Sequence, residues 1–240
     1  MSGLRDVMLL ALLPGLGVAV GGLIAETVPR SQRWLNWALH GAAGIVIAIA
    51  AIEVFPGALD AVSAWTIGIA FAAGGLAYLG AQVLIERRTA SGDTRMWMIF
   101  LAVATDLFGD GLLIGAGTAV SPSLGVTLAI GQIMANVPEG FASIATFRGN
   151  DVRRSTRLWL TAAFVVPSLA AALAGFLILR NQPESWQYTA LVAAAGLYTV
   201  AAFEDIITEA HEAATDSRRS TLALIGGFVL FVFVSAALGD

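Results

Sequence analysis

Long apolar segments alternate with short polar ones from one end of the chain to the other. Each apolar segment has about the 20 residues that an α-helix needs to cross a hydrocarbon core. Clusters rich in charged residues, proline and serine separate them, such as TVPRSQRW and FRGNDVRRSTR. The pattern predicts eight membrane-spanning helices, at residues 6–27, 36–57, 63–85, 96–118, 122–147, 157–180, 187–209 and 220–239.

The polar stretches between these segments are too short to form a soluble domain. We therefore expect residues 1–240 to form a single all-α membrane domain. The first apolar stretch, LLALLPGLGVAVGGLIA, has no small-residue cleavage signature after it. It is expected to remain as a helix rather than to be removed as a signal peptide. An even number of spans places both ends of the chain on one side of the membrane.

The positions of the basic residues predict which side that is. All 13 are arginines, and only Arg5 and Arg180 fall on the side of the two termini. The others lie in the loops after odd-numbered spans: Arg30, Arg33, Arg87, Arg88, Arg95, Arg148, Arg153, Arg154, Arg157, Arg218 and Arg219. Because cytoplasmic loops carry the excess of arginine and lysine, both termini are predicted to face outward. The compact loops favour a prokaryotic inner membrane.

Composition supports a membrane protein and narrows its chemistry. The chain is 58% hydrophobic and only 12% charged, whereas a soluble domain is roughly a quarter charged. It contains no cysteine, so disulfides and thiolate metal ligands are excluded. We expect the lipid bilayer as a partner and no nucleic acid, and the pattern leaves a homodimer open. Small residues spaced four apart, such as Gly17 and Gly21 or Gly111 and Gly115, predict close helix packing, as do Ala70 and Gly74.

Two aspartates lie near the middle of the fourth predicted span. A charge at this depth costs at least about 2.5–3.5 kcal/mol, so such residues are retained for a function by default. Asp106 and Asp110 are four residues apart and therefore share one face of a helix. Gly109 and Gly111 flank Asp110 and would loosen the backbone there.

The fifth predicted span carries a matching polar face. Gln132, Asn136 and Glu139 follow helical spacing. Pro138 is expected to break the helix and free backbone carbonyl groups. Both polar sets lie at similar distances from the external loop between the two spans. Carboxylate, amide and carbonyl oxygens at one depth suit a divalent cation, so we predict a cage of three carboxylates with nearby amides.

Further candidate ligands lie on other spans. Glu204 and Asp205 fall within span seven and are candidate ligands of the same cation. Glu209, His211 and Glu212 follow towards the cytoplasmic end, as an exit path or as a solvated helix end. At the outer end of span two, Glu53 and Asp60 form either an entrance for cations or a plain solvated loop. His40 is expected to be an interfacial anchor residue.

These motifs resemble the ZIP family of divalent metal transporters, the zinc- and iron-regulated-transporter-like proteins. The family's span four carries H-N-x-P-E-G, where this chain has DLFGDG at 106–111. Its span five typically carries a polar pair and then x-P-E-G, where this chain has ANVPEG at 135–140. The family's H-E-I-I-P-E-A-H on span seven is similar to EDIITEAH at 204–211. The segment EVFPGALDA at 53–61 is similar to the family's end of span two.

The resemblance runs over essentially the whole chain. It implies eight spans, outward termini, and transport of Zn²⁺, Mn²⁺, Fe²⁺ or Cd²⁺ towards the cytoplasm by movement of one helical bundle against another. Asp106 stands where the family has histidine, and oxygen-only ligation favours harder ions such as Mn²⁺. Ala135 stands where many members have glutamine or histidine, and from spacing we infer that Gln132, one turn before Asn136, replaces this missing ligand of span five. The metal is a transported substrate, and no organic cofactor is expected.

Two alternatives to a transporter remain. A protein of this kind could bind the metal and sense it without transport. Intramembrane aspartyl proteases also use two buried aspartates, but on neighbouring spans, and Phe108-Gly109-Asp110 matches only the end of their G-x-G-D sequence. The transporter hypothesis explains more of the motifs, so we do not expect an enzyme.

Overall fold

The computed structural model describes residues 2–28, 31–89, 95–215 and 217–239. Within these ranges the chain forms eight helical rods and no strand, which confirms the predicted all-α class. In chain order they are α1 (Ser2–Leu10) with α2 (Leu12–Thr27); α3 (Gln32–Ala48) with the π-helical turn η1 (Ile49–Val54) and α4 (Phe55–Ala61); α5 (Ala64–Thr89); α6 (Arg95–Val120); α7 (Pro122–Gly149); α8 (Arg154–Ala163) with α9 (Val165–Leu179); α10 (Glu184–Ala202) with the π-helical turn η2 (Phe203–Ile207) and α11 (Thr208–Ala213); and α12 (Arg218–Gly239). Each rod covers one predicted segment to within a few residues.

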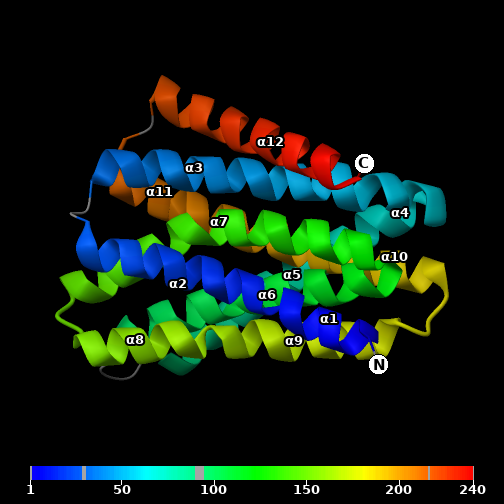
Figure 1. Ribbon diagram of the computed structural model, residues 1–240, viewed down its shortest axis with the longest axis horizontal. Helices are drawn as coiled ribbons and strands as arrows, with labels where there is room; N and C mark the ends of the chain where they lie inside the picture. The colour runs from blue at the N-terminus through cyan, green and yellow to red at the C-terminus, as the bar shows by residue number, and fades with distance from the viewer. Residues whose placement is uncertain (1, 29–30, 90–94, 216, 240) are drawn as a thin grey trace.

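The rods lie side by side along the long axis of the molecule (Figure 1). The start of α1 and the end of α12 lie at the same end of the bundle, as an even number of rods requires. The closest pairs are α2 with α7, α6 with α9, α3 with α12 and α5 with α10, while α6 also packs on α7 and on α10. Helices α6 and α7 are therefore central to the bundle.

Six of the described rods are long and apolar enough to cross a membrane. They are Gly3–Thr27, Gln32–Ala61, Ala64–Leu84, Phe100–Val120, Arg154–Leu179 and Arg218–Gly239. The other two rods are α7 and α10–α11, and α7 carries a buried polar face instead of a continuous apolar one. The chain therefore has the architecture of a multi-pass helical membrane protein.

Proline and glycine do not break the central helices, contrary to the sequence expectation. Helix α7 continues through Pro138 to Gly149. Helix α6 likewise runs unbroken past Gly109 and Gly111 to Val120. Proline removes one backbone donor from a helix, but the close packing of α2 along α7 holds the remaining turns in place. The glycines of α6 contribute to helix packing instead of bending.

Glycines bring the helix backbones into direct contact. A Cβ at Gly21 in α2 would lie 1.9 Å from the carbonyl oxygen of Val137 in α7. A Cβ at Gly111 in α6 would lie 2.2 Å from the carbonyl oxygen of Ser168 in α9. The same holds where α5 meets α10 (Gly74, Gly196) and where α3 meets α12 (Gly44, Gly227). The predicted close packing is therefore confirmed, and it occurs at each of the four closest helix pairs.

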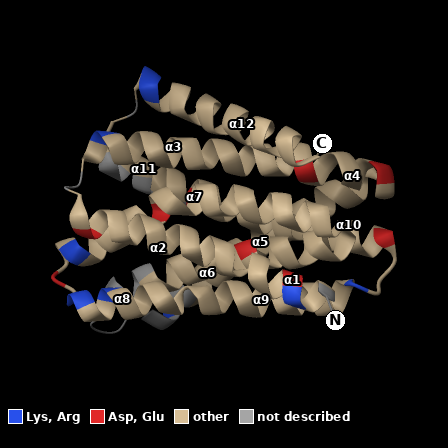
Figure 2. Ribbon diagram, in the orientation of Figure 1, with Lys and Arg blue, Asp and Glu red and all other residues tan. Residues whose placement is uncertain are grey.

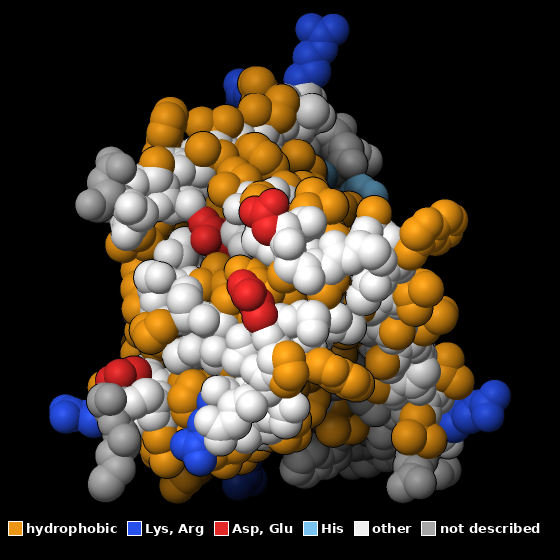
Figure 3. All heavy atoms as spheres, turned by 90° about the vertical axis from the view of Figure 1, so that its right-hand side faces the viewer, with side chains coloured by type: hydrophobic (Ala, Val, Ile, Leu, Met, Phe, Trp, Pro, Cys, Tyr) orange, Lys and Arg blue, Asp and Glu red, His pale blue; other side chains and the backbone are white. Residues whose placement is uncertain are grey.

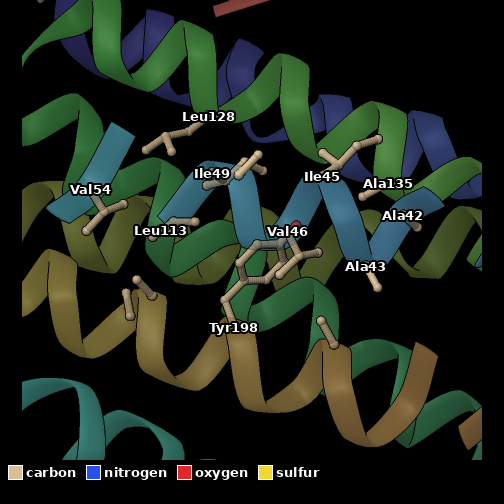
Figure 4. Packing of buried hydrophobic residues seen from close by; sticks show 14 of the residues in the cluster. Ala42, Ala43, Ile45, Val46, Ile49, Val54, Leu113, Leu128, Ala135 and Tyr198 are labelled. Carbon is tan, nitrogen blue, oxygen red and sulfur yellow. The ribbon is translucent and has the colours of Figure 1, made fainter. Parts of the chain in front are cut away.

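The apolar core lies between α3, α6, α7 and α10. Figure 4 shows Ile45 of α3 and Ile49 of η1 packed in one cluster with Leu113 of α6, Leu128 of α7 and Tyr198 of α10. All five side chains are buried. This core fixes how α6 and α7 face each other.

Charged side chains gather at the two ends of the bundle. Arginines concentrate at the end opposite the chain termini (Figure 2). Figure 3 looks onto the other end and shows several carboxylates near its middle.

At the arginine-rich end, Arg157 of α8 is buried and makes a bidentate pair with Glu26 of α2, with N–O distances of 2.6 and 2.8 Å. A third bond of 2.5 Å runs from Arg157 to the carbonyl oxygen of Val152. Sequence reasoning placed Arg157 in a loop and did not foresee this pair.

We expect Gly21→Ala to destabilise the protein, because its Cβ cannot fit against the α7 backbone. Overpacking of this kind costs about 1–3 kcal/mol. Gly80→Ala in α5 is the matched control, because a Cβ there meets nothing within 4 Å and the substitution favours the helix. Melting of the purified proteins in detergent, followed by circular dichroism, measures the difference. Equal melting temperatures for the two variants would contradict the proposed backbone contact.

Candidate functional site

Helix α6 places two carboxylates inside the bundle. Asp110 is fully buried and Asp106 is 5% exposed. They lie one turn apart and interact electrostatically. Two like charges at this depth are costly unless a proton or a cation compensates them.

Helix α7 presents two buried carboxamides to Asp110. Asn136 donates from Nδ2 to Oδ2 of Asp110 at 2.6 Å. Gln132 donates from Nε2 to the backbone carbonyl oxygen of Asp110 at 3.2 Å. The first bond is short, as expected for a donor facing a carboxylate. These two hydrogen bonds join α6 to α7. Gln132 lies beside Asp110 on the same face of α7 as Asn136, as the helical spacing of the two amides predicted.

The cluster has more acceptors than donors. Three buried oxygens have no hydrogen-bond partner among the described residues: Oδ1 of Asp110, Oε1 of Gln132 and Oδ1 of Asn136. The amide donors are directed to Asp110, so their oxygens remain without a donor. Buried polar atoms are nearly always satisfied, and a group of acceptors is satisfied by a cation, a proton or water. This surplus of oxygens is the main chemical property of the site.

Helix α10 adds a residue that sequence reasoning missed. Tyr198 is buried and lies within electrostatic range of Asp110, Asp106 and Glu139. Its position in an apolar helix resembled ordinary core packing. A tyrosine at mid-span is a weak signal in sequence, because only the fold shows that α10 packs against α6 at this level.

Glu139 occupies the edge of the cluster. Its side chain is only partly buried, and its carbonyl oxygen accepts a bond of 2.9 Å from Ser143 Oγ. In the part of the chain that the structure describes, no three carboxylate, imidazole or thiol side chains lie close enough together to hold a metal ion. The expected cage of three carboxylates is therefore not assembled. The side chains that donate hydrogen bonds to Asp110 are the carboxamides of Gln132 and Asn136.

The other predicted ligands lie apart from this cluster. Glu204 lies in η2 with an exposed side chain, and it makes no hydrogen bond or ion pair with the described residues. The side chains of Asp205, Glu209 and Glu212 lie outside the described part of the structure. The ring of His211 in α11 lies 6.1 Å from the ring of His40 in α3, centroid to centroid. The structure thus places His40 beside the predicted exit residue, although we expected only an anchor.

The predicted entrance residues lie at the end of the bundle that carries the termini. Glu53 lies in η1, partly buried, and accepts a hydrogen bond from Ser235 Oγ of α12. Asp60 in α4 is exposed. The hydrogen bond ties the end of α12 to the π-helical turn, a contact that the sequence did not indicate.

We expect Asp110→Asn to leave the metal-free protein as stable as the parent or more stable. Asparagine keeps an acceptor for Asn136 and removes a buried charge. Asp110→Leu, in contrast, leaves the Asn136 amide unsatisfied and is expected to cost about 1–3 kcal/mol. Thermal melts with a chelator test this, with Asp6→Asn on the exposed face of α1 as control. Strong destabilisation by Asp110→Asn would mean that the carboxylate is needed for the fold itself.

No protein-family model matches the chain, and no curated protein matches it either. Assignment of the cluster therefore rests on its geometry and on the chain's own motifs.

Proposed function

We propose that the protein transports divalent metal cations across the membrane, with the α6–α7 cluster as the midplane binding site. The observation that carries this proposal is the surplus of buried acceptor oxygens around Asp110. A hard divalent cation is satisfied by carboxylate and carboxamide oxygens together. Asp106 and Asp110 would supply the charge, and Gln132 and Asn136 the neutral oxygens.

The proposed topology has eight spans, with α7 and α10–α11 crossing the membrane in addition to the six apolar rods. Helix α7 can cross although it is polar, because its Gln132 and Asn136 face α6 instead of lipid. The arginine-rich end would face the cytoplasm, and both termini would face outward, in a prokaryotic inner membrane. This arrangement suits a ZIP-like transporter, the family that the motifs resemble.

A path through the protein follows from this orientation. Glu53 and Asp60, at the outer end, would attract cations to an entrance. Glu139 lies one turn beyond Asn136 towards the arginine-rich end, and would receive the cation from the cluster. Glu204, Asp205, Glu209, His211 and Glu212 belong to the rod that leads to that end and would form the exit. A small number of ligands at each step suits a carrier, because the protein must release the cation that it binds.

Uptake into vesicles tests the transport proposal. Purified protein is reconstituted into proteoliposomes, and entry of Zn²⁺, Mn²⁺, Fe²⁺ or Cd²⁺ is followed with an enclosed dye. We expect metal-dependent flux, reduced about tenfold or more by Asp110→Asn or Glu139→Gln, and unchanged by Asp6→Asn.

The outcomes separate the alternatives. Binding without flux above empty vesicles would favour a metal sensor. Flux that neither substitution reduces would place the site elsewhere in the chain. Cleavage of a reporter helix, lost in Asp106→Asn, would favour a protease; that mechanism needs aspartates on neighbouring spans, whereas Asp106 and Asp110 share α6.

Metal preference gives a second test of the same site. Imidazole suits Zn²⁺, whereas carboxylate and carbonyl oxygens suit Mn²⁺. We expect Asp106→His to raise the ratio of Zn²⁺ to Mn²⁺ uptake, measured by competition in the same vesicles. A His substitution at exposed Asp6 serves as control for an added imidazole. An unchanged ratio would exclude Asp106 from direct contact with the cation.

A further inference from the structure

A polar cavity lies at the arginine-rich end, away from the α6–α7 cluster. It has a volume of about 420 Å³ and lies between the start of α3, the end of α11 and the start of α12. Its lining residues are Arg33, Asn36, Trp37, Ala214, Thr215, Ser217, Arg218 and Arg219. No ligand proposed above for the metal cation lines it.

The lining is strongly positive. Arg33, Arg218 and Arg219 are all exposed, and none forms an ion pair with a described carboxylate. Arg218 and Arg219 lie in the first turn of α12, at the positive end of the helix dipole. That turn contains no acidic residue. The eight described lining residues include three arginines and no acid, and Asp216 is the one acid in the sequence of the adjoining stretch 215–219. An anion in the cavity would relieve this repulsion.

Hydrogen bonds connect the helices around the cavity. The Asn36 amide donates to the carbonyl oxygens of Ala210 at 2.9 Å and Ala214 at 3.1 Å. Ser220 donates to Oδ1 of Asn36 at 2.6 Å. Ser217 and Ser220 also cap each other's backbone N–H groups at the start of α12. These bonds hold together α3, α11 and α12, the helices from which the lining residues come.

Aromatic residues place the cavity at the level of a membrane interface. The guanidinium of Arg219 lies 5.2 Å from the centre of the Trp37 ring. Trp34 packs edge-on against Trp37 at 5.2 Å and is 70% exposed. Tryptophans on the outside of a helical bundle mark the headgroup region of the bilayer.

We propose that this cavity binds a phosphate group, held by the guanidinium groups of Arg33, Arg218 and Arg219 and by the hydroxyl of Ser217. Guanidinium groups match phosphate oxygens in geometry and charge. Basic pockets between helices on the cytoplasmic side bind the headgroups of anionic lipids. The phosphate is that of an anionic phospholipid or a soluble phosphate, and in either case it joins α3 to α12. This inference does not depend on metal transport.

Ligand-dependent thermal stability tests the proposal, because a ligand that binds only the folded state raises Tm. The full-length protein in neutral detergent, at constant ionic strength, is titrated with dihexanoyl phosphatidylglycerol, dihexanoyl phosphatidylcholine or inorganic phosphate. We expect phosphatidylglycerol to raise Tm and phosphatidylcholine, whose headgroup has no net charge, to have little effect. Stabilisation by inorganic phosphate as well would identify the phosphate group alone as sufficient. Stabilisation by phosphatidylglycerol only would identify the lipid as the source.

Paired variants locate the effect. Arg33→Gln combined with Arg218→Gln should weaken apparent binding by about tenfold or more. Arg87→Gln combined with Arg153→Gln removes the same charge from exposed positions outside the cavity and should leave binding unchanged. The ligand-free melting temperature of each variant shows that it is folded. The proposal is overturned if no phosphate compound raises Tm, or if both paired variants lose the effect equally.

Discussion

The contact between Asp110 of α6 and the amides of α7 is the interaction on which the interior of this protein depends. Within hydrocarbon no water can satisfy a polar group, so a buried carboxylate must be matched by partners from a neighbouring helix. Asn136 and Gln132 supply those partners and fix the register of α6 against α7. Their own oxygens then remain without donors. The same bonds that hold the two helices together therefore create a site that is short of positive charge.

Helix packing makes this arrangement possible. Glycines let α2 approach α7 and let α6 approach α9 with backbone in contact with backbone. Such contacts replace the hydrophobic driving force that lipid does not provide. Helix α2 packs against α7 on both sides of Pro138, and α7 continues through that residue without a break. The polar faces of α6 and α7 consequently meet inside the bundle and not at its lipid-facing surface.

The two ends of the bundle have different chemistry. The arginine-rich end contains both the Glu26–Arg157 pair and the cavity near Trp37, whereas the opposite end exposes acidic groups such as Asp60 and Glu184. In the orientation proposed above, the acidic end would concentrate cations outside the membrane, and the basic end would anchor the protein to anionic lipid inside. The proposed transport direction and the proposed phosphate site are thus compatible, and they depend on different residues.

The sequence by itself determined the helical class and the approximate bounds of each rod, because apolar length and charge clusters are local properties. It also identified Asp106, Asp110, Gln132 and Asn136, since polar residues are costly in an apolar span. Only the tertiary structure decided which of these residues meet. It turned Asn136 and Gln132 towards Asp110, placed Tyr198 beside them, left Glu139 at the edge and exposed Glu204. It also placed Arg33 of α3 around the same cavity as the arginines of α12, which are far from it in the chain. These outcomes depend on which helices are neighbours and how they are rotated, and that is set by contacts between distant segments that no local pattern encodes.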